Sequence, residues 1–81
     1  MGDYIITETQ WDGVEGHDAV IGAAVQEHSY NQARFEFLYR SAYAIISSIP
    51  YHTIEMKTAA GERIDIARYT PDRFTNGGGN A

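Results

Sequence analysis

The chain has 81 residues, with six Lys and Arg against eleven Asp and Glu, no cysteine, and a formal charge of −5. A chain of this length is one domain with a thin core, which buries only about 60–65% of its unfolded surface and gains stability by association. The lack of cysteine excludes disulfides, thiolate zinc sites and thiol catalysis, and the scattered basic residues disfavour general nucleic-acid binding through phosphates.

The sequence gives no sign of a membrane segment. No apolar run approaches the ~20 residues that span a bilayer, and the N-terminus lacks the basic region and apolar stretch of a signal peptide. We therefore expect no membrane contact and a cytoplasmic location.

The first half of the chain predicts one strand, followed by a second element that could be either a helix or a strand. Residues 4–11 are rich in β-branched and aromatic side chains, which favour a strand, and Gly13 and Gly16 follow as turn signals. The composition of residues 18–28 does not decide their secondary structure, because their alanines allow a helix whereas their valine, isoleucine and glycine favour a strand. A hairpin return is the more economical arrangement so soon after the first strand.

A helix is predicted from Ser29 to about Ser47. Ser29 with Gln32 three residues later forms a capping box, in which the hydroxyl accepts from a free backbone N–H. The helix ends before Pro50, because a proline disfavours the helical conformation of the residue that precedes it.

This helix is apolar on two opposite faces at about 100° per residue. The face expected to pack on the sheet carries Tyr30, Ala33, Phe37, Leu38, Ala44 and Ile45. The opposite face carries Phe35, Tyr39, Ala42, Tyr43 and Ile46. Because one thin sheet covers only one face, we expect the second to be the interface of a homodimer or higher homo-oligomer. The alternative is that its tyrosines lie half exposed with their hydroxyls in water.

The second half of the chain contains the clearest hairpin. Residues 51–57 and 63–69 alternate between apolar and polar side chains, around a short loop that contains Gly61. In the later strand, the alternation places Ile64 and Ile66 inward.

The order of elements is ββαββ. We expect an α+β domain over residues 1–70, with a four-stranded antiparallel sheet and one helix packed on one face. Residues 71–81 are expected to form a flexible, Gly-rich C-terminal tail. Opposite the helix, the core is expected to contain Ile6 or Ile5, Ile21, Ile54, Met56, Ile64 and Ile66.

No catalytic or metal motif is present. The three histidines, His17, His28 and His52, are far apart without ligand spacing, and no nucleophile motif or phosphate loop occurs. Glu55 and Asp65 are expected on the outer face of the hairpin, paired with nearby basic side chains. We therefore expect no catalytic residues, no metal, no cofactor and no enzymatic activity.

Aromatic and arginine residues supply the candidate ligand or partner contacts: Trp11, Tyr51, Arg63, Arg68 and Tyr69. Stacking rings and arginine forks are how small nucleotides are held, at a sheet end or a dimer seam. The alternative is that the rings fill a thin core and the arginines cover it.

The order of these features resembles small accessory proteins encoded by bacteriophages. The resemblance rests on the strand at residues 4–8, on Ala33 and Phe37 in a capped helix, and on residues 48–52 opening a hairpin with Gly61 in its turn. It extends over about residues 4–69. Proteins of this size and acidity include inhibitors of bacterial defence, such as anti-CRISPR proteins and proteins that sequester immune nucleotides. The resemblance implies a phage-encoded binder and transfers no functional residue.

The resulting hypothesis is a non-enzymatic phage-type binding protein that inhibits a bacterial defence component by protein–protein contact in the host cytoplasm. Acidic strand faces, with Glu8, Glu55 and Asp65, would meet a basic patch on the host protein, and buried aromatics would supply most of the association energy. One alternative is an oligomeric sponge for a small immune-signalling nucleotide. Another is a structural or regulatory phage accessory protein.

Overall fold

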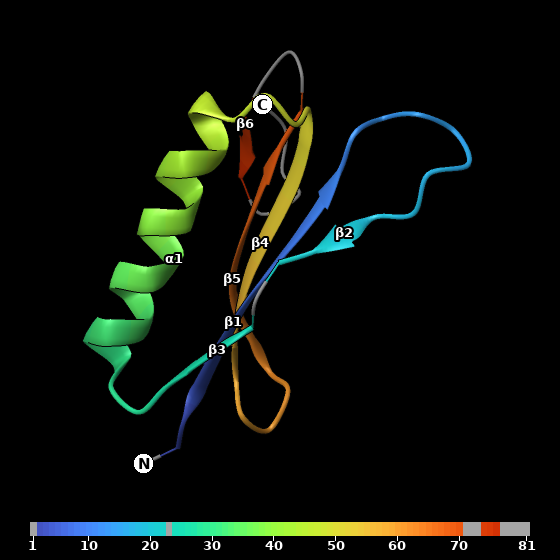
Figure 1. Ribbon diagram of the computed structural model, residues 1–81. Helices are drawn as coiled ribbons and strands as arrows, with labels where there is room; N and C mark the ends of the chain where they lie inside the picture. The colour runs from blue at the N-terminus through green and yellow to red at the C-terminus, as the bar shows by residue number, and fades with distance from the viewer. Residues whose placement is uncertain (1, 23, 71–73, 77–81) are drawn as a thin grey trace.

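The computed structural model describes residues 2–22, 24–70 and 74–76, which form one sheet and one helix. The elements in chain order are β1 (Tyr4–Trp11), β2 (Val20–Ile21), β3 (Val25–Glu27), α1 (Tyr30–Ile46), β4 (Tyr51–Thr58), β5 (Arg63–Tyr69) and β6 (Phe74–Asn76). The helix lies across one face of the sheet (Figure 1). The predicted α+β class and the ββαββ order are confirmed.

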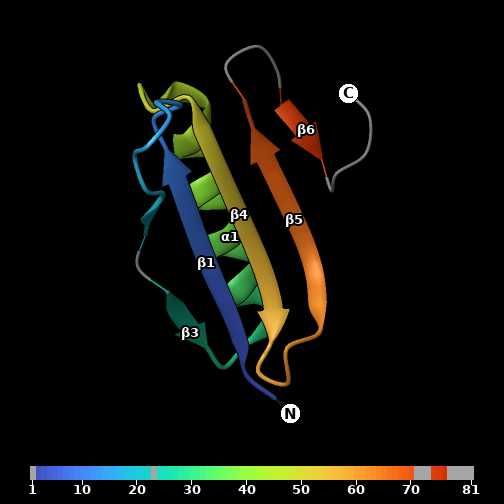
Figure 2. The same cartoon turned by 90° about the vertical axis from the view of Figure 1, so that its right-hand side faces the viewer.

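The sheet is antiparallel throughout its described pairs, in the order β2-β1-β4-β5-β6, with β3 also paired to β1. Figure 2 shows the face away from the helix, with β1 and β4 side by side at its centre. These two strands pair along their full length, from Tyr4 opposite Thr58 to Trp11 opposite Tyr51. The first strand of the chain and the strand that follows the helix are therefore the two central strands.

Residues 18–28, whose type the sequence left open, return beside β1 as two short strands. Thr9 lies opposite Ile21 in β2, and Ile6 lies opposite Val25 in β3, so the register shifts by one residue between the two. Between them the Gly22 N–H donates to the Glu8 carbonyl at 2.5 Å. A Cβ on Gly22 would lie 3.1 Å from that same oxygen, so glycine permits this close approach.

Helix α1 begins and ends where the sequence predicts. Ser29 is the N-cap in an extended conformation, and its hydroxyl accepts from the Gln32 N–H at 3.3 Å. Ser47 is the C-cap and is again extended. The Ser41 hydroxyl donates to the Phe37 carbonyl at 2.8 Å inside the buried face, as expected of a polar residue that satisfies its own hydrogen bond in a helix.

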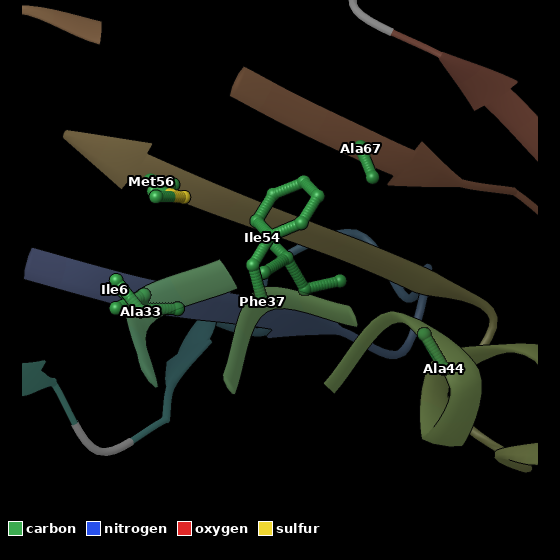
Figure 3. Packing of buried hydrophobic residues seen from close by; sticks show 7 residues of the cluster. All are labelled: Ile6, Ala33, Phe37, Ala44, Ile54, Met56 and Ala67. Atoms are coloured by element: carbon green, nitrogen blue, oxygen red, sulfur yellow. The ribbon is translucent and has the colours of Figure 1, made fainter. Parts of the chain in front are cut away.

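The core lies between α1 and the two central strands. Figure 3 shows the Phe37 ring projecting from the helix over β4, near Ile54. The cluster consists of Ile6, Ala33, Phe37, Ala44, Ile54, Met56 and Ala67, with Tyr4 and Tyr69 packed at its margin. The inward positions of Ile6, Ile54 and Met56 are confirmed. Leu38 and Ile45, expected to face the sheet, are 54% and 67% exposed, so the buried stripe is narrower than predicted.

The prediction for β5 is wrong in its orientation. Met56 lies opposite Asp65 and Ile54 opposite Ala67, so Asp65 and Ala67 face the helix and Ile64 and Ile66 face the other side. Ile66 is nevertheless only 5% exposed, so its predicted burial is confirmed although its face is not, whereas Ile64 is 36% exposed. The register shifts between Met56 and Lys57, which is a bulge that an apolar–polar alternation does not reveal.

The C-terminal segment also differs from the prediction. Within the expected flexible tail at 71–81, residues 74–76 form strand β6, which pairs with β5 through Tyr69 opposite Phe74. The rest of that segment, 71–73 and 77–81, lies outside the described residues.

Candidate functional site

The helix surface opposite the core is apolar and exposed. We call this surface the outer helix face and define it as Phe35, Leu38, Tyr39, Ala42, Tyr43, Ile45 and Ile46. Its large side chains are from 49% exposed, at Tyr39, to 77% exposed, at Ile46. At about 100° per residue these positions span an arc of roughly 160°, and no charged residue falls within it. The five residues predicted as an oligomer interface all belong to this face.

Three rings form a ladder along the outer helix face. Phe35 stacks on Tyr39 with ring centroids 5.9 Å apart, and Tyr43 meets Tyr39 edge-on at 5.0 Å. A side-chain hydrogen bond with Tyr43 raises the pKa of Tyr39 above its ordinary value of 10.0. None of the seven residues of the face is Asp, Glu, Lys or Arg, so the face is uncharged.

The charged side chains that border this face are engaged within the chain. Arg34 donates to Asp65 at 2.8 Å, with its guanidinium 5.3 Å from the centre of the Phe37 ring. Arg40 donates to Glu36 at 2.7 Å and lies 3.5 Å from Glu8. These ion pairs hold the charges toward the sheet and leave the outer helix face apolar.

A buried polar cluster lies under the C-terminal half of the helix. The Glu8 carboxylate lies 2.7 Å from Nδ1 of His52, and the two residues are 8% and 4% exposed. The Nε2 atom of His52 is buried without a hydrogen-bond partner. Buried polar atoms are nearly always satisfied in proteins, so an orphan of this kind calls for an explanation.

An open cavity of about 380 Å³ adjoins this cluster. The sheet contributes Glu8, Gln10 and His52, and the helix end with the segment that follows contributes Tyr43, Ile46, Ser47 and Ile49. None of these residues is Lys or Arg. Tyr43 and Ile46 also belong to the outer helix face, so the two features are continuous.

The structure brings together only part of the predicted ligand-contact set. Trp11 lies opposite Tyr51, with ring centroids 5.2 Å apart, and Arg68 lies opposite Thr53 on the same uncovered sheet face. Arg63 lies at the other end of the hairpin and donates to Glu55 at 2.8 Å. Tyr69 faces the helix and packs against the core.

The loop that follows β1 holds the Trp11 side chain in place. Its indole Nε1 donates to the His17 carbonyl at 2.9 Å, and the His17 ring lies 2.7 Å from the Asp12 carboxylate. The bond to His17 lowers the pKa of Asp12 below its ordinary value of 3.8. A second cavity of about 360 Å³ lies here between Trp11 and Ile49.

The expected acidic strand face is not formed. Glu8 is buried and bonded to His52, and Asp65 faces the helix and binds Arg34. Glu55 alone lies on the uncovered face, where Arg63 pairs with it. Glu55 and Asp65 were both predicted on the outer face of the hairpin, paired with basic side chains, but the register described above places them on opposite faces.

Sequence reasoning missed the pairing of Glu8 with His52. A signal was available, since both occupy inward positions in strands whose other inward residues are apolar: Ile6 precedes Glu8 by two, and Ile54 follows His52 by two. A polar residue at such a position needs a partner on the same face.

Two further features concern the residues that the structure describes. These residues hold no group of three or more His, Asp or Glu side chains placed to bind a metal ion. No helix in the part of the chain that the structure covers is long and apolar enough to cross a membrane. In the comparisons with known proteins, no family model, no curated protein and no solved structure matches the chain.

Proposed function

We propose that the protein is a non-enzymatic binding protein that assembles with a second copy of itself through the outer helix face. The observation that carries this proposal is the charge-free arc from Phe35 to Ile46 on the solvent side of a helix whose other side is already buried. Monomers rarely expose a contiguous apolar patch of this size.

A second copy fits this face better than a charged partner does. The face contains no charge, so its complement is uncharged, and a twofold axis brings the face against itself. Phe35, Leu38, Ala42 and Ile45 recur at alternating spacings of three and four, the pattern of a helix–helix seam. The small Ala42 near the middle of the seam lets two helix backbones approach closely.

The available area is of the size that a stable dimer needs. The exposed fractions of the six large residues correspond to on the order of 700 Å² if a large side chain offers roughly 200 Å². Standard interfaces bury about 800 Å² per partner. In an antiparallel pair, Phe35 of one copy would pack near Ile46 of the other, and Leu38 near Tyr43.

The experiment is to replace Tyr39 and Tyr43 by Asp and to measure mass by light scattering over a dilution series. We expect wild type to show twice the monomer mass and the double variant to show monomers. The control carries Thr9→Asp and Ala19→Asp, which add the same charge at exposed positions away from α1, and should keep the dimer mass. A monomeric wild type, or an unchanged mass in the Tyr variant, would reject the interface.

We infer further that the assembled protein acts on a host protein, as the resemblance to phage accessory proteins implies, by inhibiting a bacterial defence component in the cytoplasm. The surface that supports such a contact is the uncovered sheet face with Trp11, Tyr51 and Arg68. Trp, Tyr and Arg are the residue types that dominate binding energy at interfaces. Trp11 is also held in place by its bond to the His17 carbonyl, which lowers the entropic cost of binding.

This part of the proposal has its own test. Tagged wild type, Trp11→Ala and Arg68→Ala are compared in pull-downs from bacterial lysate, with Tyr39→Asp/Tyr43→Asp alongside. A specific host protein should be captured by wild type and lost with both sheet-face variants. Equal capture by the variants would place the contact elsewhere.

A nucleotide sponge is the second candidate, because the Trp11 and Tyr51 rings, which contact each other at a tilt, lie on the same face as the exposed Arg68. Only one of the two predicted arginines is available, since Arg63 is engaged by Glu55 at the far end. Mass spectrometry of small molecules released on denaturation separates the two functions. A released nucleotide supports the sponge, and its absence with a captured host protein supports the inhibitor.

A further inference from the structure

The cavity beside Glu8 and His52 has the chemistry of a binding site. Its polar wall is built by side chains that are themselves buried, with Glu8 8% and His52 4% exposed. The Nε2 atom of His52 is buried without a hydrogen-bond partner. The volume of about 380 Å³ falls in the range of roughly 300–1,000 Å³ that is typical of small-molecule sites.

The charges around the cavity favour a cation. The cluster holds two carboxylates, Glu8 and Glu36, against one guanidinium, Arg40. Arg40 binds Glu36 closely, at 2.7 Å, and reaches Glu8 only at 3.5 Å. A lone pair of Glu8 is therefore left for another donor, and no lining residue is a cation that would attract a phosphate.

The rest of the wall suits an apolar body attached to that cation. Tyr43, Ile46 and Ile49 supply one aromatic and two aliphatic side chains, and a tyrosine ring attracts an ammonium group placed over its face. Acceptors on the sheet side and an aromatic ring on the helix side together select an organic ammonium ion.

We propose that this cavity binds a small primary ammonium ligand with a flat apolar body, its ammonium group donating to Glu8. One chain supplies every wall of the site, and two of these walls, Tyr43 and Ile46, also belong to the proposed dimer interface, so a second copy would pack beside the cavity. The site differs from the nucleotide surface, which lies on the opposite sheet face.

The test is a titration of the ¹⁵N-labelled protein at pH 7 with three probes of one shape: benzylamine, benzyl alcohol and benzoate. We expect saturable shifts of the amides of Glu8, Gln10, Ser47 and His52, with benzylamine. Benzylamine and benzyl alcohol would both donate to the Glu8 carboxylate, but only the ammonium group adds an opposite charge. Benzylamine should therefore bind about tenfold more tightly than benzyl alcohol, and benzoate more weakly still. Equal affinities, shifts that cluster elsewhere, or no saturation would overturn the proposal.

Two variants test the roles of the Glu8 charge and of the Tyr43 ring in binding. Glu8→Gln keeps the shape and removes the charge, so the tenfold preference for benzylamine should vanish. Should Glu8→Gln fail to fold, Tyr43→Leu changes a wall that also lies in the proposed dimer interface, and it should weaken benzylamine about two- to fivefold while leaving benzyl alcohol nearly unchanged. Unchanged benzylamine affinity in Tyr43→Leu would also count against the site. The dimer mass, measured in the same samples, reports separately on self-association.

Discussion

The Glu8 carboxylate on β1 and the His52 imidazole on β4 lie 2.7 Å apart as a diagonal pair across the two central strands. Glu8 is opposite Ile54, and His52 is opposite Gln10, so the two side chains reach across one diagonal on the helix-facing side. They close one end of a core that is mainly apolar. Stability and the candidate ligand site therefore depend on the same contact.

Removing one member of this pair should be costly. We expect Glu8→Ala and His52→Ala each to lower the free energy of unfolding by about 3 kcal/mol, because each leaves a buried polar group without its partner. The double variant should lose less than the sum of the two, with a coupling energy of about 1–3 kcal/mol. Urea denaturation followed by circular dichroism measures all three.

An exposed pair provides the matched control for this cycle. Glu55 lies on the uncovered face and binds Arg63, which is 54% exposed. Glu55→Ala should cost at most about 1 kcal/mol, because solvent screens exposed ion pairs. Equal losses for Glu8→Ala and Glu55→Ala would show that the buried pair has no special role.

The start of the helix can be tested at its cap. Ser29→Ala should lower the free energy of unfolding by about 1 kcal/mol, because the Gln32 N–H loses its acceptor. Ser29→Asp keeps an acceptor and adds a negative charge to a first turn that has no acidic residue. It should therefore match or exceed wild type in thermal melts, and a loss equal to that of Ser29→Ala would contradict the capping role.

A surface pair predicts a pH dependence with a definite sign. The hydrogen bond to the Asp3 carboxylate raises the pKa of His28 above 6.5, and the same bond lowers the pKa of Asp3 below 3.8. The stabilisation due to His28 is complete below pH 6.5 and is lost as the pH rises through the raised value. The part due to Asp3 is present above pH 3.8 and is lost as the pH falls through the lowered value.

NMR of the His28 side chain measures its pKa directly. The titration midpoint should lie above 6.5 in wild type and should fall toward 6.5 in Asp3→Asn, which removes the negative partner. His28 is 83% exposed at its side chain, so the fold is expected to remain intact in both proteins. A midpoint that does not move in Asp3→Asn would show that the contact does not persist in solution.

The sequence was sufficient for those features that local chemistry decides. The cap at Ser29, the helix end before Pro50 and the inward side chains of Ile6, Ile54 and Met56 follow from capping, proline sterics and strand alternation. The exposure of the outer helix face follows because the helix has two apolar faces and a single sheet covers only one side of a helix.

Features that depend on pairing between strands could not be predicted from the sequence. A bulge after Met56 reverses the faces of β5, so Asp65 points at the helix although two flanking isoleucines are more apolar. The diagonal contact of Glu8 with His52 joins residues 44 positions apart. The inward position of each residue indicates that it needs a partner, but it does not identify that partner. Strand β6 has only three residues and exists through its pairing with β5.

The orientation of Asp65 offers a direct test of that reversed strand. Because Asp65 binds Arg34 on the helix side, Arg34→Ala and Asp65→Ala should be coupled by about 0.5–1 kcal/mol, a value limited by the partial exposure of both side chains. The matched control pairs Arg34→Ala with Glu55→Ala, since Glu55 lies on the other face and binds Arg63. These two should be additive within about 0.3 kcal/mol. If the strand instead followed its apolar alternation, Asp65 would point away from α1 and both cycles would be additive, so the difference between them decides the register.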